Sequence, residues 1–212
     1  MTADRASSVA GPAAGPDRYD RALSSVAGLN LTKDQLLVWT GQHLTPAAPR
    51  FREAGILWLD GVIDVERFGR AVECVIRGSD ALRTAIEVVA GWPRQIVREG
   101  SSSPLQVVEL TAAADPEAEW RRRAASWARA EEAIAERLFR LVLGSLSSDR
   151  AALYVEQHQL ISDAWSFALL SQRLCEAYAA IGDGRTLAAD RWPQFSEYVA
   201  FERVLRAGAA YR

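Results

Sequence analysis

Apolar residues recur along this chain with the spacing of amphipathic helices in some stretches and of strands in others. After Asp64, one helical stripe collects the apolar side chains Val65, Phe68, Ala71, Val72, Val75 and Ile76. This pattern predicts a helix that begins after an Asp64 N-cap and packs one face against a core. A helix is also predicted in "LTKDQLLVWTGQHL", because Thr32 and Gln35 have the spacing of a capping box.

Three more helices are predicted in the second half of the chain. Asp115 and Pro116 begin a long helix, with proline at its first position and acidic residues in its first turn. Residues 163–181 form an amphipathic helix that ends near Gly182. The last helical stretch is "PQFSEYVAFERVLRA".

Strands are predicted between these helices, and several of them form hairpins. The segment "REAGILWLDG" is apolar on both faces, which predicts a strand that is buried on both sides. Two strands flank a turn at 91–93, a short strand is predicted in "LQVVEL", and a hairpin turns at 147–149. Since hairpins are mixed with helices, we expect an α+β layer sandwich rather than a doubly wound parallel sheet.

The composition is that of an ordinary globular protein. The chain has 212 residues, 49% of them hydrophobic, with a net charge of −2, which gives no reason to expect nucleic acid or an anionic membrane as a partner. No apolar run approaches the roughly 18 residues of a membrane span, and the N-terminus lacks the pattern of a secretory signal. We interpret residues 1–19 as a disordered leader, and Cys74 and Cys175 as buried, reduced thiols of a cytoplasmic protein.

The stretch "VEQHQLISDAWS", residues 155–166, carries the candidate chemistry. His158 lies where a strand ends and could act as a general base, with Asp163 orienting it. The alternative is a hydrogen-bonded, partly buried histidine followed by an Asp163 that caps the next helix. No metal-ligand spacing, phosphate-binding glycine loop or cysteine–histidine pair is present, so no bound cofactor or metal is expected.

Three motifs in order resemble a known family. The stretches "LTKDQLLVWTGQ", "RGSDALRTAI" and "HQLISDAWS" are similar to the first three core motifs of the condensation domains of nonribosomal peptide synthetases, and "PQFSEYVAFER" is similar to the segment that leaves their N-terminal lobe. The resemblance covers residues 31–206 and extends to the chloramphenicol acetyltransferase superfamily. It implies an N-terminal lobe over residues 20–185 and an exit loop and helix over residues 186–212.

The resemblance also implies a mechanism and a set of site residues. In the family, carrier proteins deliver two phosphopantetheine-linked substrates to a tunnel between two lobes, where the amine of one attacks the thioester of the other. His158 matches the first histidine of the family's central motif and Asp163 its structural aspartate, with Arg83 as the expected partner of Asp163. Gln159 stands at the position of the catalytic histidine, and an amide cannot act as a general base.

The resemblance further implies that the second lobe is missing from this chain. A single lobe should expose an apolar face, which predicts self-association, a partner subunit or carrier proteins as partners. Three functions therefore remain open: an impaired half of a peptide-bond-forming domain, a non-catalytic lobe that docks a carrier protein, and an oligomeric acyltransferase of the chloramphenicol type.

Overall fold

The structure, a computed structural model, describes residues 31–44, 51–89, 91–99, 105–130, 138–185 and 192–207, so the predicted leader lies outside the described residues. Its centre is a four-stranded sheet in the order β1-β6-β5-β4. The strands are β1 (Arg52–Asp60), β4 (Gln106–Glu109), β5 (Phe139–Ser147) and β6 (Arg150–His158). β6 pairs antiparallel with both β1 and β5, while β4 pairs parallel with β5.

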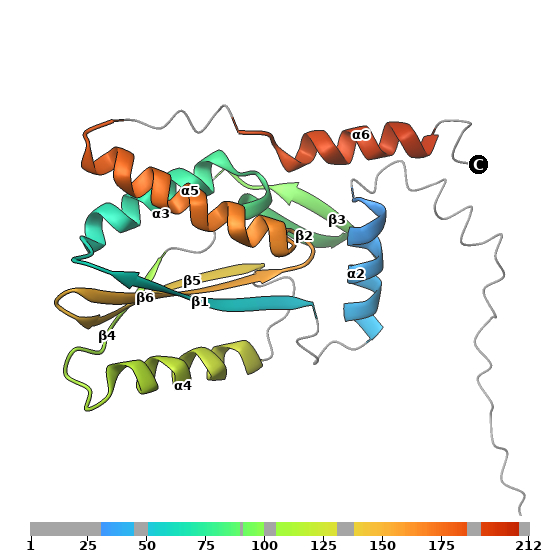
Figure 1. Ribbon diagram of the computed structural model, residues 1–212. Helices are drawn as coiled ribbons and strands as arrows, with labels where there is room; N and C mark the ends of the chain where they lie inside the picture. The colour runs from blue at the N-terminus through green and yellow to red at the C-terminus, as the bar shows by residue number, and fades with distance from the viewer. Residues whose placement is uncertain are drawn as a thin grey trace, which may run out of the picture.

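Helices cover both faces of this sheet (Figure 1). On one face lie α3 (Val65–Gly78) and α5 (Ala164–Gly182), and on the other lies α4 (Pro116–Arg129). The predicted α+β sandwich is therefore confirmed, as a single lobe.

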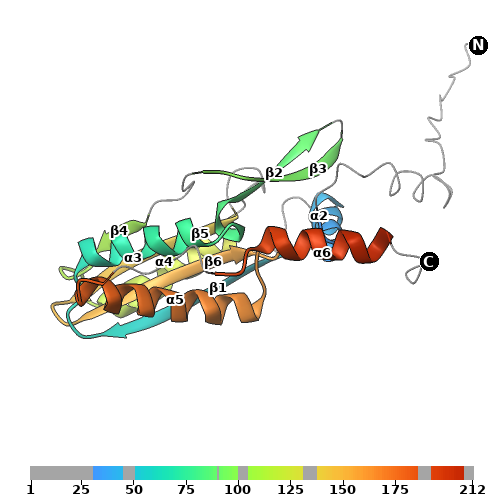
Figure 2. The ribbon, with the colours of Figure 1, turned by 90° about the horizontal axis from the view of Figure 1, so that it is seen from above.

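Two helices and a hairpin lie around one end of the sheet. α2 (Lys33–Leu44) crosses that end, and α6 (Phe195–Ala207) runs from the start of α5 toward α2. After the short 3₁₀ helix η2 (Ala81–Arg83), the strands β2 (Thr84–Val89) and β3 (Trp92–Val97) form a separate two-stranded sheet. Figure 2 shows this hairpin projecting to one side of the main sheet.

The predicted helix caps are present in the structure. The carboxylates of Asp64, Asp115 and Asp163 each accept a hydrogen bond from the backbone N–H three residues later, at 2.9, 2.9 and 2.7 Å. At the start of α2, the Thr32 hydroxyl accepts from the backbone N–H of Gln35, and the Gln35 amide oxygen accepts from the backbone N–H of Thr32. Each cap satisfies a backbone donor that the first helical turn leaves without a partner.

Two details of the sequence prediction are wrong. The strand β1 is not buried on both sides: its residues are half-buried or exposed, because it lies at the edge of the sheet and pairs only with β6. Cys74 is buried as expected, but Cys175 is exposed, because its position on α5 faces away from the core.

Candidate functional site

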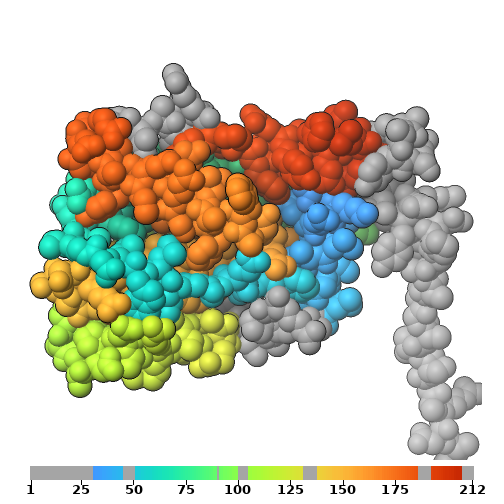
Figure 3. All heavy atoms as spheres, viewed as in Figure 1, coloured from blue at the N-terminus to red at the C-terminus, as the bar shows by residue number. Residues whose placement is uncertain are grey.

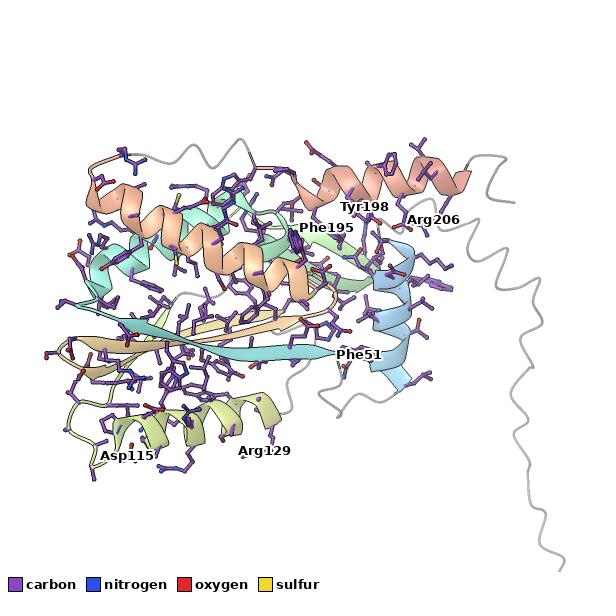
Figure 4. The ribbon with its side chains drawn as sticks, in the orientation of Figure 1. Phe51, Asp115, Arg129, Phe195, Tyr198 and Arg206 are labelled. Carbon is purple, nitrogen blue, oxygen red and sulfur yellow. The ribbon has the colours of Figure 1, made fainter. Side chains whose placement is uncertain are left out.

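The end of β6 opens onto a pocket of about 580 Å³. Four elements surround this pocket: the start of α2, the end of α3, the first half of α5 and the start of α6 with the residues before it. In Figure 4, Phe195 and Tyr198 mark the part of α6 that contributes to the pocket lining. Gln157, residues 159–163 and Ser166 of the stretch 155–166 therefore line a cavity that α2, α3, α6 and the rest of α5 complete.

His158 points away from this pocket. Its side chain is only 1% exposed, and its Nδ1 accepts a hydrogen bond from the backbone N–H of Leu160 at 3.1 Å. Burial, and secondarily the charge of Arg52, lower the pKa of His158 to about 4. The ring is therefore neutral near pH 7 and supports the turn after β6.

Gln159 is exposed and lines the pocket. Its backbone N–H donates to the carbonyl of Phe51 at 2.7 Å, which extends the β1–β6 pairing by one step. Successive residues of a strand point to opposite faces, so Gln159 and Gln157 face the pocket while His158 faces the other way. The amide nitrogen of Gln159 donates to a carboxylate oxygen of Glu53 at 3.2 Å.

The structure does not bring Asp163 and Arg83 together. Asp163 accepts hydrogen bonds from both the backbone N–H and the hydroxyl of Ser166, which lower the pKa of the Asp163 carboxyl. Arg83 donates from Nη1 to the backbone carbonyl of Arg98 at 2.9 Å. Among the described residues, no ion pair joins the two side chains.

Asp80, which sequence reasoning missed, holds the α6 side of the pocket in place. Its two carboxylate oxygens accept from the backbone N–H groups of Phe195 and Ser196 at 2.7 and 2.8 Å. The side chain of Gln194 accepts from the backbone N–H of Asp80 and donates to the carbonyl of Gly78. The start of α6 is thus capped by Asp80, which lies between α3 and η2, more than 100 positions earlier in the chain.

A buried polar network that the sequence did not reveal lies on the other face of β6. The carboxylate of Glu156 is 2.6 Å from Nη1 of Arg52 and accepts a hydrogen bond from the Tyr154 hydroxyl at 2.7 Å. Burial, followed by the hydrogen bond to Glu156, raises the pKa of Tyr154. A glutamate that directly follows the largely apolar run 151–155 of β6 was the available signal, since buried charges require partners.

Comparisons with known proteins assign the chain to a family. A family model described as "Condensation domain" matches residues 28–211. The chain belongs to the condensation-domain family. It is 32% identical over 195 residues to the isonitrile lipopeptide synthase of Mycobacterium tuberculosis, an alignment that covers 89% of this chain and 8% of that protein. It is 26% identical over 162 residues to the dimodular nonribosomal peptide synthase of Bacillus subtilis, covering 74% of this chain and 7% of that protein.

Solved condensation domains have the same fold. The starter condensation domain of rhizomide synthetase superposes with a TM-score of 0.79 at 24% identity, covering 84% of this chain and 45% of that one. The first condensation domain of the calcium-dependent antibiotic synthetase gives a TM-score of 0.73 at 28% identity, covering 85% and 44%. The chain thus corresponds to a single lobe and spans less than half of these solved domains.

This condensation lobe exposes an apolar face. Along one side of α6 lie the exposed residues Tyr198, Phe201, Val204 and Leu205. Near the start of α5, Trp165 is 78% exposed and Leu169 is exposed as well. In Figure 3, α6 and the first half of α5 lie at the surface of the face shown. Exposed apolar groups gathered on one side are typical of a surface that contacts another protein.

Within the described part of the chain, no cluster of three or more histidine, cysteine or acidic side chains could hold a metal ion. The helices described here are also too short or too polar to cross a membrane.

The role of Asp163 as a cap leads to a prediction for this condensation lobe. Asp163→Ala should lower the free energy of unfolding by about 1 kcal/mol, because α5 loses its N-cap acceptor. Asp163→Ser retains a capping oxygen and should lose less. In a double-mutant cycle measured by urea unfolding, Asp163→Ala and Arg83→Ala should be additive, and a coupling above about 0.5 kcal/mol would contradict their separation.

Burial of the His158 ring predicts that acid destabilises the lobe. Since the pKa of His158 is about 4 in the folded protein and about 6.5 in an unfolded chain, the unfolded chain binds more protons between these pH values. The stability that neutral His158 contributes is therefore present above about pH 6.5 and falls as the pH drops toward 4, by up to about 3 kcal/mol.

The variant His158→Asn isolates this effect, because its side-chain oxygen can still accept from Leu160 but does not titrate. Urea unfolding at pH 7 and pH 4.5 should show a smaller loss of stability for the variant than for the parent. Equal losses would mean that His158 is accessible to protons in the folded state.

Proposed function

We propose that this chain is one half of a condensation domain that holds an amine nucleophile beside a carrier-bound acyl thioester. The observation that carries the proposal is that Gln159, at the position of the family's catalytic histidine, is exposed in the pocket while His158 is buried behind it. In the reaction, the amine lone pair attacks the thioester carbonyl carbon and the C–S bond breaks. The pantetheine thiolate leaves, and the amine nitrogen loses a proton to solvent.

In this proposal, rate acceleration comes from position rather than from proton transfer. The Gln159 amide can accept and donate hydrogen bonds but cannot take the proton of the attacking amine. Holding two reactants in line can nevertheless supply a large part of a rate acceleration. We therefore expect slow amide formation compared with a domain that has histidine at this position.

The partners in this proposal are carrier proteins and a second lobe. Condensation domains act on carrier-bound substrates, and one of the solved relatives was crystallised with C8-CoA. The apolar face formed by α6 and the start of α5 is the surface that a second lobe or another synthetase subunit would cover. Arg83, which forms no ion pair with Asp163, has no role in the reaction in this proposal, and its Nη1 donates to the carbonyl of Arg98.

Mixing the chain with an aminoacyl carrier and an acyl carrier, and detecting products by mass spectrometry, tests the proposal. We expect slow formation of the amide product, and at least a tenfold loss in Gln159→Ala. Arg122→Ala is a matched control, because Arg122 is exposed on α4, on the opposite face of the sheet. An unchanged rate of product formation in Gln159→Ala would contradict the proposal.

The second candidate is a non-catalytic lobe that docks carrier proteins. Gln159 also favours this function, because an amide at position 159 cannot act as a general base. Carrier binding measured by calorimetry, without any amide product, would support this function and reject the first.

A further inference from the structure

Glu53 lies beside the residue on which the proposed function depends. In the β1–β6 register Glu53 is opposite Gln157, and the pairing continues to Phe51 opposite Gln159. Glu53, Gln157 and Gln159 therefore share one face of the sheet. The Gln159 nitrogen donates to the Glu53 carboxylate, and among the described residues no cation forms an ion pair with this carboxylate.

This hydrogen bond determines which end of the Gln159 amide remains available. An ionised carboxylate only accepts hydrogen bonds, so the amide must present its NH₂ group to Glu53. The carbonyl oxygen of Gln159 is then turned away from Glu53 and remains free to accept a hydrogen bond from a ligand in the pocket. With this hydrogen bond in place, position 159 presents an acceptor, whereas a glutamine without a partner could present either group.

Gln157 supplies a second acceptor. Its side chain is 2% exposed and lines the pocket, and its Oε1 is shielded from solvent without a hydrogen-bond partner among the described residues. A buried acceptor without a donor is unfavourable. A ligand that satisfies the Gln157 oxygen must therefore carry an N–H or O–H donor. Gln157 and Gln159 are two residues apart on one face, about 7 Å along the strand. Glutamine side chains are long enough for both amide oxygens to accept hydrogen bonds from one ligand nitrogen placed between them.

The charges around the pocket suit an amine rather than an anion. Three carboxylates line it, on Asp34, Asp80 and Asp163. The one basic lining residue among those described, Arg173, forms an ion pair with Glu176 at 2.8 Å. The carboxylates of Asp80 and Asp163 accept from the N-termini of α6 and α5, and Arg173 is paired, so the described lining offers no unpaired cation to a phosphate or carboxylate and can accommodate a neutral amine.

We propose that Glu53 is a positioning residue that turns the Gln159 oxygen toward the pocket, so that Gln157 and Gln159 together select a primary over a secondary amine as nucleophile. This inference rests on the proposed function. A neutral primary amine has two N–H groups, one for each amide oxygen, and keeps its lone pair for attack on the thioester. A secondary amine has one N–H group and leaves one acceptor without a partner.

Binding of two stable substrate analogues tests this selection. The probes are alanyl-pantetheine amide and its N-methylalanyl counterpart, titrated into the chain by NMR at about pH 9, where both amines are largely neutral. We expect the primary amine to bind about tenfold more tightly, the effect of one hydrogen bond. Glu53→Ala should bring the ratio close to one, and Glu53→Asp should restore part of it. Glu66→Ala, an exposed change on α3, should leave it unchanged.

The side-chain resonances of Gln159 provide a readout that requires no ligand. In the parent protein, hydrogen bonding to Glu53 should shift the NH₂ signals of Gln159, and Glu53→Ala should return them to the values of a solvated glutamine. Unchanged signals in Glu53→Ala would overturn the positioning role. Equal affinities for the two analogues would overturn the selection alone, whereas failure of both to bind at millimolar concentration would reject the proposed function and this inference with it.

Discussion

Replacing Gln159 with histidine is expected to accelerate amide formation by about 10²- to 10⁴-fold, the usual contribution of a positioned general base. Strand alternation places the side chain of residue 159 in the pocket, so an imidazole at this position would face the substrates. The Glu53 carboxylate, which now binds the Gln159 amide, could accept a ring N–H and stabilise the imidazolium that forms when the proton is taken. The carrier assay with mass spectrometry measures the gain.

Two further measurements separate this explanation from a general effect on the pocket. Gln159→Asn keeps an amide and should give no gain. The rate of Gln159→His should rise with pH as the new imidazole loses its proton, in a range near its ordinary pKa of about 6.5, whereas the parent should lack this step. A histidine variant as slow as the parent would show that the missing base is not what limits this lobe.

Replacing Trp120 with alanine should produce the largest loss of stability, about 3–5 kcal/mol. Trp120 is fully buried and joins α4 to the sheet, packing among Val142, Ala152 and Tyr154. Its ring lies directly over Gly144: a Cβ atom at that position would be only 2.5 Å from the ring. Removing the indole leaves a cavity between α4 and β5 that the surrounding backbone cannot close.

Trp120→Phe is the informative control. The indole nitrogen of Trp120 has no hydrogen-bond partner among the described residues, so phenylalanine loses volume but no hydrogen bond. It should cost much less than alanine in urea unfolding at a fixed protein concentration. If the two variants were equally unstable, the indole nitrogen would have a partner, and packing alone would not explain the role of Trp120.

The helices were largely predictable because the signals that begin them are local. Asp64, Asp115 and Asp163 each lie one residue before a helix and cap it within three residues, so the order of residues along the chain was enough. The burial of β1 was not predictable in this way. Its apolar residues on both faces suggested a central strand, and only the strand order placed it at the edge.

The candidate site also combines features that follow from local sequence with features that depend on contacts between distant residues. Strand alternation, a local property, explains why the structure places His158 and Gln159 on opposite faces. The expected pair of Arg83 and Asp163 depended on long-range geometry, and the structure keeps the two side chains apart.

The sequence by itself determined the helix caps, the hairpin that delivers His158 and Gln159, and the motifs that identify a condensation domain. Only the tertiary structure decided which side chains meet at the pocket. Glu53 reaches Gln159 across 106 positions, and Asp80 caps α6 across 115. Such contacts follow from strand register and from how helices pack on the sheet, because residues far apart in the chain come together only when the whole lobe has folded.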